Sequence, residues 1–218
     1  MTAVDLCLPV DDLSLARRCA AGDPVAVRLI TAANNQRLFR AAWSILKDRS
    51  EAEDAVQSAY LKAFSAIKGF EGRSSLSTWL TSIAVNEALT RVRSLKRTRS
   101  RLEAEGVTLM DNYRQPDAPD EVLARVQVRV LIERAIAALP AAFRTVLVLR
   151  DVEGMNVDET AETLGITPAT VKTRLHRARR KLRETLAPEV RNVLVGAFPF
   201  AGPDCERMTK RLLDSMSG

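Results

Sequence analysis

One segment in the second half of the chain constrains the fold most, because it predicts two short helices joined by a tight turn. Asn156 stands three residues before Glu159, the spacing at which two side chains cap the amides of a first helical turn. Gly165 ends this helix, and a second begins after Thr167, a capping residue, with Pro168 in its first position. A short helix, a turn that begins with glycine and a second helix form the pattern of a helix-turn-helix.

The second of these helices carries cations on the side that its predicted core leaves exposed. The core positions are Val157, Ala161, Leu164, Ile166, Val171 and Leu175. The exposed positions are Lys172, Thr173, His176 and Arg177, followed by Arg179, Arg180 and Arg183. Arginine and lysine bind both guanine edges and phosphates, so the pattern indicates a helix that enters the major groove of DNA. The alternative is an ordinary helical hairpin with a charged outer face.

Composition favours helices throughout the chain. Aromatic residues make up 5% of the 218 residues, and Gly and Pro contribute nine each, which fits a β-sandwich or a β-barrel poorly. The length suits two small domains rather than one bundle. No stretch approaches the roughly 20 uncharged apolar residues of a membrane span, so we expect no membrane insertion. The predicted fold class is all-α, with two small helical domains.

The cysteines and the N-terminus indicate a cytoplasmic protein. Cys7, Cys19 and Cys205 are too few and too scattered for a disulfide framework. The first residues lack the basic flank of a secretory signal.

Charge is concentrated in two basic blocks, and the net charge is +6. The first block holds Arg91, Arg93, Lys96, Arg97, Arg99 and Arg101, and the second runs from Lys172 to Arg183. An acidic stretch separates them, with Glu103, Glu105, Asp111, Asp117, Asp120 and Glu121. Two basic blocks around an acidic spacer predict a polyanion that is contacted at two places.

These patterns divide the chain into five predicted parts. They are an N-terminal extension over residues 1–11, a helical bundle over 12–98, an extended acidic linker over 99–120, a helix-turn-helix domain over 121–186 and a tail over 187–218. A short helix is expected in the tail from about Asp204 to Met216. We expect this tail to pack Phe198 and Phe200 on the second domain, with a regulatory contact or a redox role for Cys205 as alternatives.

Local signals place helix ends within the bundle. Asp23 and Pro24 mark a helix start, and Asn34 with Asn35 then interrupts the apolar stripe, which leaves open one bent helix or two.

Two further helices are expected in the bundle. Ser50 and Glu53 have capping-box spacing for the next helix, which Gly69 ends. Another helix is expected from about Leu76 to Arg97.

In the second domain, Leu131, Ala135, Ala138 and Leu139 are the expected apolar face of the helix that precedes Pro140.

Several motifs follow one another in a characteristic order. They are Gly22-Asp23, Ala52-Glu53-Asp54-Ala55-Val56-Gln57, Phe70-Glu71-Gly72, Ser74-Ser75-Leu76-Ser77-Thr78-Trp79-Leu80, Ile83-Ala84-Val85-Asn86, Val152-Glu153-Gly154 and the run from Gly165 to Arg179. In this order and spacing the chain resembles bacterial RNA polymerase sigma factors of the extracytoplasmic-function (ECF) group. The resemblance covers about residues 15–186 and implies a region 2-like bundle joined to a region 4-like helix-turn-helix.

The resemblance implies binding to core RNA polymerase and promoter-specific initiation of transcription, including help in melting the DNA. The polymerase-binding residues would be Glu53, Asp54 and Gln57. The downstream ("minus ten") promoter element would contact Lys68, Phe70, Arg73, Ser74, Asn86, Arg91 and Arg93. The upstream ("minus thirty-five") element would contact Arg150, Thr170, Lys172, Thr173, His176, Arg177 and Arg180. The family usually has an acidic residue where this chain has Ser58.

The resemblance also implies an anti-sigma factor as a partner and a role in stress response. We expect no catalytic residue, metal or cofactor, because the sequence has no paired acid and base, nucleophile or ligand cluster, and His176 stands alone in a basic run. The rival interpretation is a free-standing helix-turn-helix regulator, which would bind duplex DNA without a polymerase. A more distant one is an adaptor with a basic surface for RNA or an anionic membrane.

Overall fold

The computed structural model describes residues 11–104, 123–186 and 214. Within these ranges the chain forms helices and no strand, which confirms the all-α prediction. The first half holds α1 (Asp12–Ala20), α2 (Pro24–Leu46), α3 (Arg49–Ala66), the 3-10 turn η1 (Ile67–Gly69) and α4 (Leu76–Ala104). The second half holds α5 (Leu123–Ala138), α6 (Ala141–Leu147), the π-helical turn η2 (Val148–Val152), α7 (Val157–Leu164) and α8 (Pro168–Thr185).

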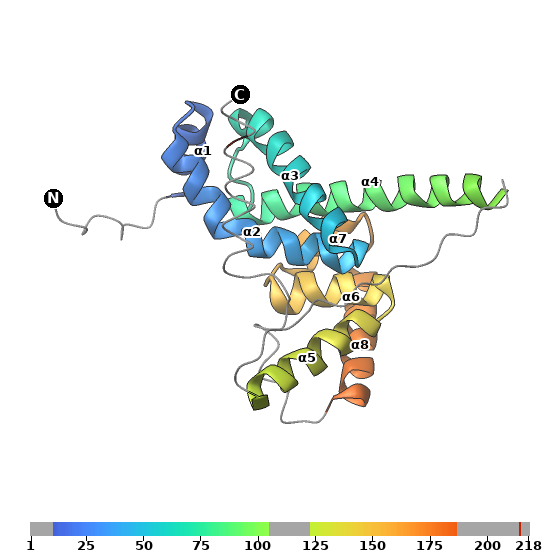
Figure 1. Cartoon of the computed structure of the whole chain (residues 1–218). Helices are drawn as coiled ribbons and strands as arrows, with labels where there is room; N and C mark the ends of the chain where they lie inside the picture. Colours follow the sequence, from blue (N-terminus) through green and yellow to red (C-terminus); the bar gives the residue numbers. More distant parts are fainter. Residues whose placement is uncertain (1–10, 105–122, 187–213, 215–218) are drawn as a thin grey trace.

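The helices form two packed groups that touch each other (Figure 1). In the first group α2, α3 and α4 pack mutually around Leu38, Phe39, Tyr60 and Leu80, and α1 packs against α2 and η1. In the second group α6 and α7 both pack against α8. The described helices include none with the length and hydropathy required to cross a membrane.

Helix α2 begins as predicted. The Asp23 carboxylate accepts hydrogen bonds from the amides of Val25 (2.8 Å) and Ala26 (3.4 Å), and Pro24 occupies the first position. The two asparagines do not divide the helix. Both are buried, and the Asn34 side chain donates to the Ile30 carbonyl at 2.8 Å, so its amide reinforces the helix instead of ending it.

The cap of helix α3 lies two residues before the predicted cap Ser50. Asp48 caps it by accepting a hydrogen bond from the Glu51 amide at 2.8 Å, so the predicted Ser50–Glu53 box is wrong. A cap must lie outside the helix with extended backbone, as Asp48 does, whereas Ser50 is already helical. Glu53 instead pairs with Arg49 at 3.0 Å.

Helix α4 begins at Leu76 as predicted but runs past Arg97 to Ala104. Residues 99–104 of the predicted linker are therefore helical, because they contain good helix formers and no glycine or proline. Residues 1–10, 105–122 and 187–213 lie outside the described part, and the predictions for the linker and tail lie largely there.

The helix-turn-helix is present, with both predicted caps. The Asn156 side chain accepts a hydrogen bond from the Glu159 backbone amide at 2.8 Å, and the Glu159 side chain accepts one from the Asn156 backbone amide at 2.7 Å. Gly165 has a positive φ of 61°, and the Thr167 hydroxyl accepts a hydrogen bond from the Thr170 amide at 3.2 Å.

The predicted apolar face of α5 is partly wrong. The buried residues are Ile132, Ala135, Ile136, Ala137 and Leu139, while Leu131 is 52% exposed and Ala138 is also exposed. Packing on the rest of the second half selects this face, and the apolar pattern alone fits both.

Candidate nucleic-acid interface

Helix α8 separates an apolar face from a polar one. Val171, Leu175, Ala178 and Leu182 are buried at three- and four-residue steps. The predicted readout residues Lys172, Thr173, His176 and Arg177 are all exposed on the other side. The exposed face of α8 therefore presents two cations, a hydroxyl and an imidazole. An α-helix fits into the major groove of DNA, so these groups can reach base edges there.

The first turn of α8 has a defined hydroxyl pattern. The Thr167 and Thr170 hydroxyl oxygens lie 2.8 Å apart, and Thr173 donates its proton to the Ala169 carbonyl at 2.9 Å. The Thr173 oxygen therefore retains only its acceptor capacity toward an outside ligand.

Two arginines, one on α8 and one in η2, make contacts within the second half of the chain. Arg179 makes a bidentate pair with Asp151 at 2.8 and 2.5 Å, and this hydrogen bonding raises the pKa of Arg179. Arg150 is half-buried and donates to the Met155 carbonyl. Arg150 thus shapes the turn that leads to α7, while Arg180 remains exposed on α8 and lies 3.7 Å from Glu184.

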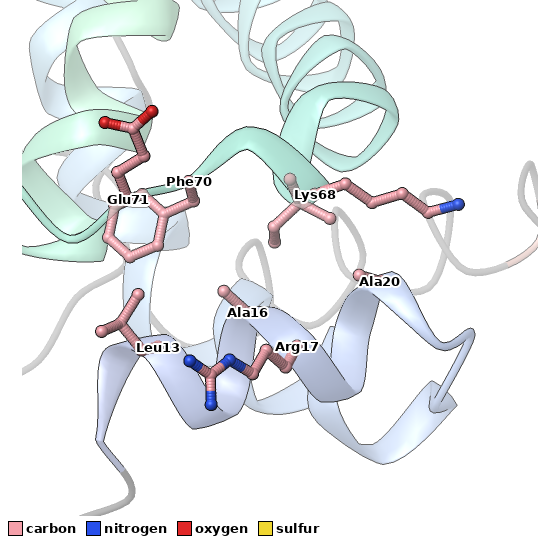
Figure 2. A pocket seen from close by; sticks show the side chains of 8 residues that line it. Leu13, Ala16, Arg17, Ala20, Lys68, Phe70 and Glu71 are labelled. Atoms are coloured by element: carbon pink, nitrogen blue, oxygen red, sulfur yellow. The ribbon is translucent and has the colours of Figure 1, made fainter.

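The segment from η1 to the start of α4, of which Figure 2 shows Lys68, Phe70 and Glu71, brings some predicted DNA-contact residues to the surface and hides another. Lys68 and Arg73 are exposed, and Arg73 pairs with Glu71 at 2.6 Å. Phe70 is only 9% exposed, and its ring centroid lies 5.5 Å from that of Trp79. In this form Phe70 belongs to the core, whereas Ser74 is half-buried and donates to a neighbouring carbonyl.

Helix α1 organises this segment, a role that the sequence did not predict. The Asp12 carboxylate accepts a hydrogen bond from the Leu76 amide at 2.7 Å and so caps α4 from outside. Leu13 packs so closely that a Cβ at Gly72, whose φ is +71°, would lie 3.3 Å from it. Helix α1, including its Arg17, lines a pocket beside Phe70 together with Lys68 of η1 (Figure 2).

The predicted residues on α4 divide between solvent and structure. Asn86 and Arg93 are exposed. Arg91 instead joins α4 to α3, with one nitrogen 3.1 Å from the Glu51 carboxylate and another donating to the Ser58 hydroxyl at 3.2 Å. Ser58, which replaces an acidic residue of the family pattern, thus has a hydrogen-bonding role here.

The predicted polymerase-binding residues lie together on α3. Asp54 is exposed, Gln57 is half-buried one turn later, and Glu53 is held by its pair with Arg49. This face therefore offers a carboxylate and an amide to a partner surface.

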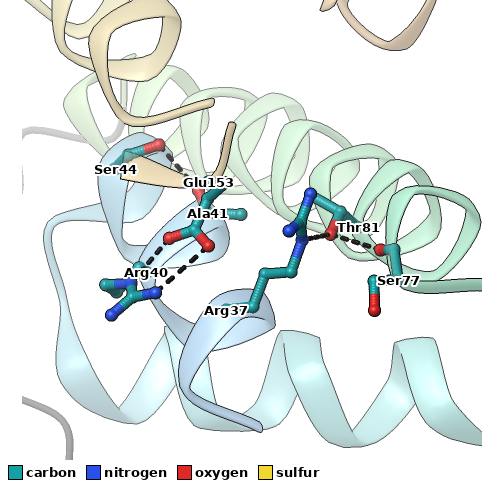
Figure 3. A network of polar contacts seen from close by, with 7 residues as sticks. All are labelled: Arg37, Arg40, Ala41, Ser44, Ser77, Thr81 and Glu153. Carbon is teal, nitrogen blue, oxygen red and sulfur yellow. Dashed lines mark hydrogen bonds and ion pairs between the residues drawn. The ribbon is translucent and has the colours of Figure 1, made fainter. Parts of the chain in front are cut away.

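A buried ion pair joins the two halves, and no local pattern in the sequence indicated it (Figure 3). Arg40 of α2 meets both carboxylate oxygens of Glu153, at 2.6 and 3.1 Å, and the Glu153 side chain is 2% exposed. Burial raises the pKa of Glu153, and the Arg40 hydrogen bonds and charge oppose that shift. Arg37, one turn away, donates to the Thr81 hydroxyl at 2.9 Å, and burial lowers its pKa while Glu153 and Glu159 raise it.

Further contacts between the halves surround this pair. Arg144 donates to the Ser44 carbonyl at 2.6 Å, and the hydroxyl oxygens of Ser82 and Thr163 lie 2.8 Å apart. Nearby, Ala41 and Val85 of the first half form an apolar cluster with Leu149 and Met155 of the second.

Comparison with known proteins identifies the family. Residues 30–98 match the family described as Sigma-70 region 2, and residues 129–182 match Sigma-70, region 4. The ECF RNA polymerase sigma factor SigW of Bacillus subtilis is 33% identical over 171 residues, which cover 76% of this chain and 91% of SigW. The chain belongs to the ECF RNA polymerase sigma factors. The RNA polymerase sigma-H factor of Pseudomonas aeruginosa is 28% identical, over 83% of this chain and 96% of that protein.

Solved structures with a similar fold include a sigma factor. The sigma factor RpoE of Bartonella quintana, in complex with the anti-sigma factor NepR, has a TM-score of 0.54 at 28% identity and covers 72% of this chain and 91% of its own. CnrH, in complex with the cytosolic domain of CnrY, has a TM-score of 0.52 at 28% identity and covers 79% and 95%. The family prediction is therefore confirmed.

The described part of the chain has no group of three or more His, Cys, Asp or Glu residues placed to bind a metal ion. Cys19 is buried, and burial raises the pKa of its thiol.

Proposed function

We propose that this sigma factor binds core RNA polymerase through α3 and selects promoters through two separate DNA-contact surfaces. The observation that carries the proposal is the exposed cationic face of α8 on a capped helix-turn-helix, in a chain that matches both sigma regions. Promoter selection and melting require binding and strand capture and no covalent step in this chain. We propose that the protein acts in the cytoplasm.

The upstream promoter element would be read by α8. Lys172 and Arg177 are suited to guanine edges, while Thr173 would accept a hydrogen bond from a base and His176 would contact a base or a phosphate. Thr170 and Arg180 would extend the contact along the backbone, and Arg150 would support the turn before α7.

The downstream element would be taken by the first half. Lys68, Arg73 and Ser74 lie on the segment before α4, and Asn86 and Arg93 lie along α4. Phe70 reaches a flipped base only if the segment moves away from α1, and Arg91 reaches DNA only by leaving Glu51. Opening DNA without a fuel requires such captured bases, whose stacking offsets the lost pairing.

Transcription in vitro tests the proposal. Core polymerase with this protein should give discrete transcripts from a pool of promoter fragments that core polymerase alone does not give. Replacing Lys172 and Arg177 by Ala should remove them, whereas Arg28→Ala, at an exposed position of α2, should not. Duplex binding by the protein alone, without transcripts, would favour the free-standing regulator.

A second experiment tests α3. A double variant, Asp54→Lys with Gln57→Ala, should bind core polymerase more weakly than the wild type. Glu162→Lys, at an exposed position of α7, is the charge control. Equal binding of all three proteins would contradict the assignment of this face.

We also propose an anti-sigma factor as a partner, because the similar structure of the sigma factor RpoE is a complex with the anti-sigma factor NepR. Co-purification with the candidate inhibitors encoded by the host would test this, and no complex with any of them would refute it.

A further inference from the structure

Arg37 and Arg40 present two cations on one face of α2, and the second half of the chain covers that face. Arg40 pairs with Glu153 across the interface, and Arg37, one turn earlier on the same helix, donates to the Thr81 hydroxyl of α4 (Figure 3). The charge of Glu153 also acts on Arg37. A planar guanidinium that binds a carboxylate with two nitrogens binds a phosphate in the same way. The Glu153 carboxylate therefore occupies a site with the chemistry of a phosphate site.

This covered face continues onto α4, beside a residue proposed to contact promoter DNA. Ser82 and Val85 of α4 touch the second half, through the Thr163 hydroxyl and the cluster around Met155. Asn86 follows directly on the same helix and is exposed. DNA that reaches Asn86 along α4 would meet the second half where it now lies.

The closed arrangement does not fit a promoter. The minus-thirty-five and minus-ten elements are named for positions about 25 base pairs apart, which is about 85 Å along a duplex that rises 3.4 Å per base pair. A compact chain of this length has a radius of gyration of about 17 Å, or a diameter of about 45 Å. The two halves must therefore separate on the promoter, and their separation exposes Arg37 and Arg40.

We propose that Arg37 and Arg40 bind backbone phosphates of the duplex promoter in the open form, and that Glu153 occupies this site in the closed form. The inference rests on the proposed function, because it takes promoter DNA as the ligand. The two arginines thus form a phosphate-binding pair that the closed form masks.

Binding of a fluorescent 30-base-pair duplex by the full chain, between 50 and 200 mM salt, tests the proposal. Glu153→Lys opens the interface by placing a third cation against the two arginines. Glu162→Lys makes the same charge change at an exposed position and is the matched control. Two added phosphate contacts should steepen the salt slope of log K by about 1.8 relative to the control. Over a fourfold change in salt this is about a 12-fold larger change in affinity.

Second substitutions in the Glu153→Lys protein identify the residues responsible. Arg40→Ala should remove about 0.9 of the slope, and Arg40→Lys, which keeps the charge, should retain it. Equal slopes for Glu153→Lys and Glu162→Lys would overturn the proposal. So would a gain that persists without Arg37 and Arg40, or a loss that Arg40→Lys does not restore.

Failure of this inference is distinguishable from failure of the proposed function. The duplex-binding assay contains no polymerase, and transcription by the wild-type protein with core polymerase is measured separately. Promoter-dependent transcripts together with equal salt slopes would reject only the phosphate site.

Discussion

Arg40→Ala removes one partner of an ion pair that is buried only while the two halves are in contact. The Arg40 side chain is 11% exposed and that of Glu153 is 2% exposed. Removing one member of such a pair costs about 3–5 kcal/mol, because the remaining charge stays desolvated. Both groups are hydrated once the halves separate, so the cost falls on the closed form. The ratio of closed to open protein should therefore fall by roughly 150- to 5,000-fold.

Energy transfer between two fluorophores measures this ratio in the free protein. Ser65 on α3 and Glu184 on α8 are exposed positions in different halves and accept labels through non-natural amino acids. Arg28→Ala removes the same charge from the exposed side of α2 and is the control. A change in Arg40→Ala of less than about tenfold relative to Arg28→Ala would refute the reasoning, because it would mean that the pair contributes little to closure.

Three further predictions concern other parts of the molecule. The double variant Ser82→Cys with Thr163→Cys should form a disulfide under oxidation, because the two hydroxyl oxygens lie 2.8 Å apart. The cross-linked protein should lose promoter-dependent transcription and regain it with reductant. Full activity of the oxidised protein would contradict the need for the two halves to separate. Asp48→Ala should lower the free energy of unfolding by about 1 kcal/mol and Ser50→Ala by clearly less, and denaturant unfolding distinguishes the real cap from the apparent one. Asp23 has a lowered pKa, chiefly through its hydrogen bond from Arg18, so its stabilisation of the folded protein is present above the ordinary pKa of 3.8 and is lost as the pH falls. Asp23→Asn should cap α2 equally well without this pH dependence. Parallel pH profiles of thermal unfolding for the two proteins would disprove the linkage.

The parts of the fold that the sequence predicted correctly depend on neighbours within one or two helical turns. Asp23 with Pro24, Asn156 with Glu159, and Thr167 with Pro168 all mark helix starts in the structure. A cap acts on amides two or three residues away, so its chemistry is complete within the local sequence. The start of α3 shows the limit of such patterns, because the predicted cap Ser50 is already helical and Asp48, two residues earlier, caps the helix instead.

The candidate DNA surfaces divide in the same way. The exposed face of α8 follows from the period of its apolar residues, so Lys172, His176 and Arg177 could be assigned from the sequence. Phe70 could not be placed in this way, because its burial depends on α1 and Trp79, which meet it only in the folded bundle.

The sequence by itself determined the helical class, the caps of the helix-turn-helix and the family to which the chain belongs, since each is written in short patterns of adjacent residues. The tertiary structure alone decided that Arg40 meets Glu153, 113 positions away. Arg40 reads locally as one more cation of α2, and Glu153 as part of a turn before α7. Their pairing depends on two domains burying opposite charges against each other, and no local spacing encodes such a contact.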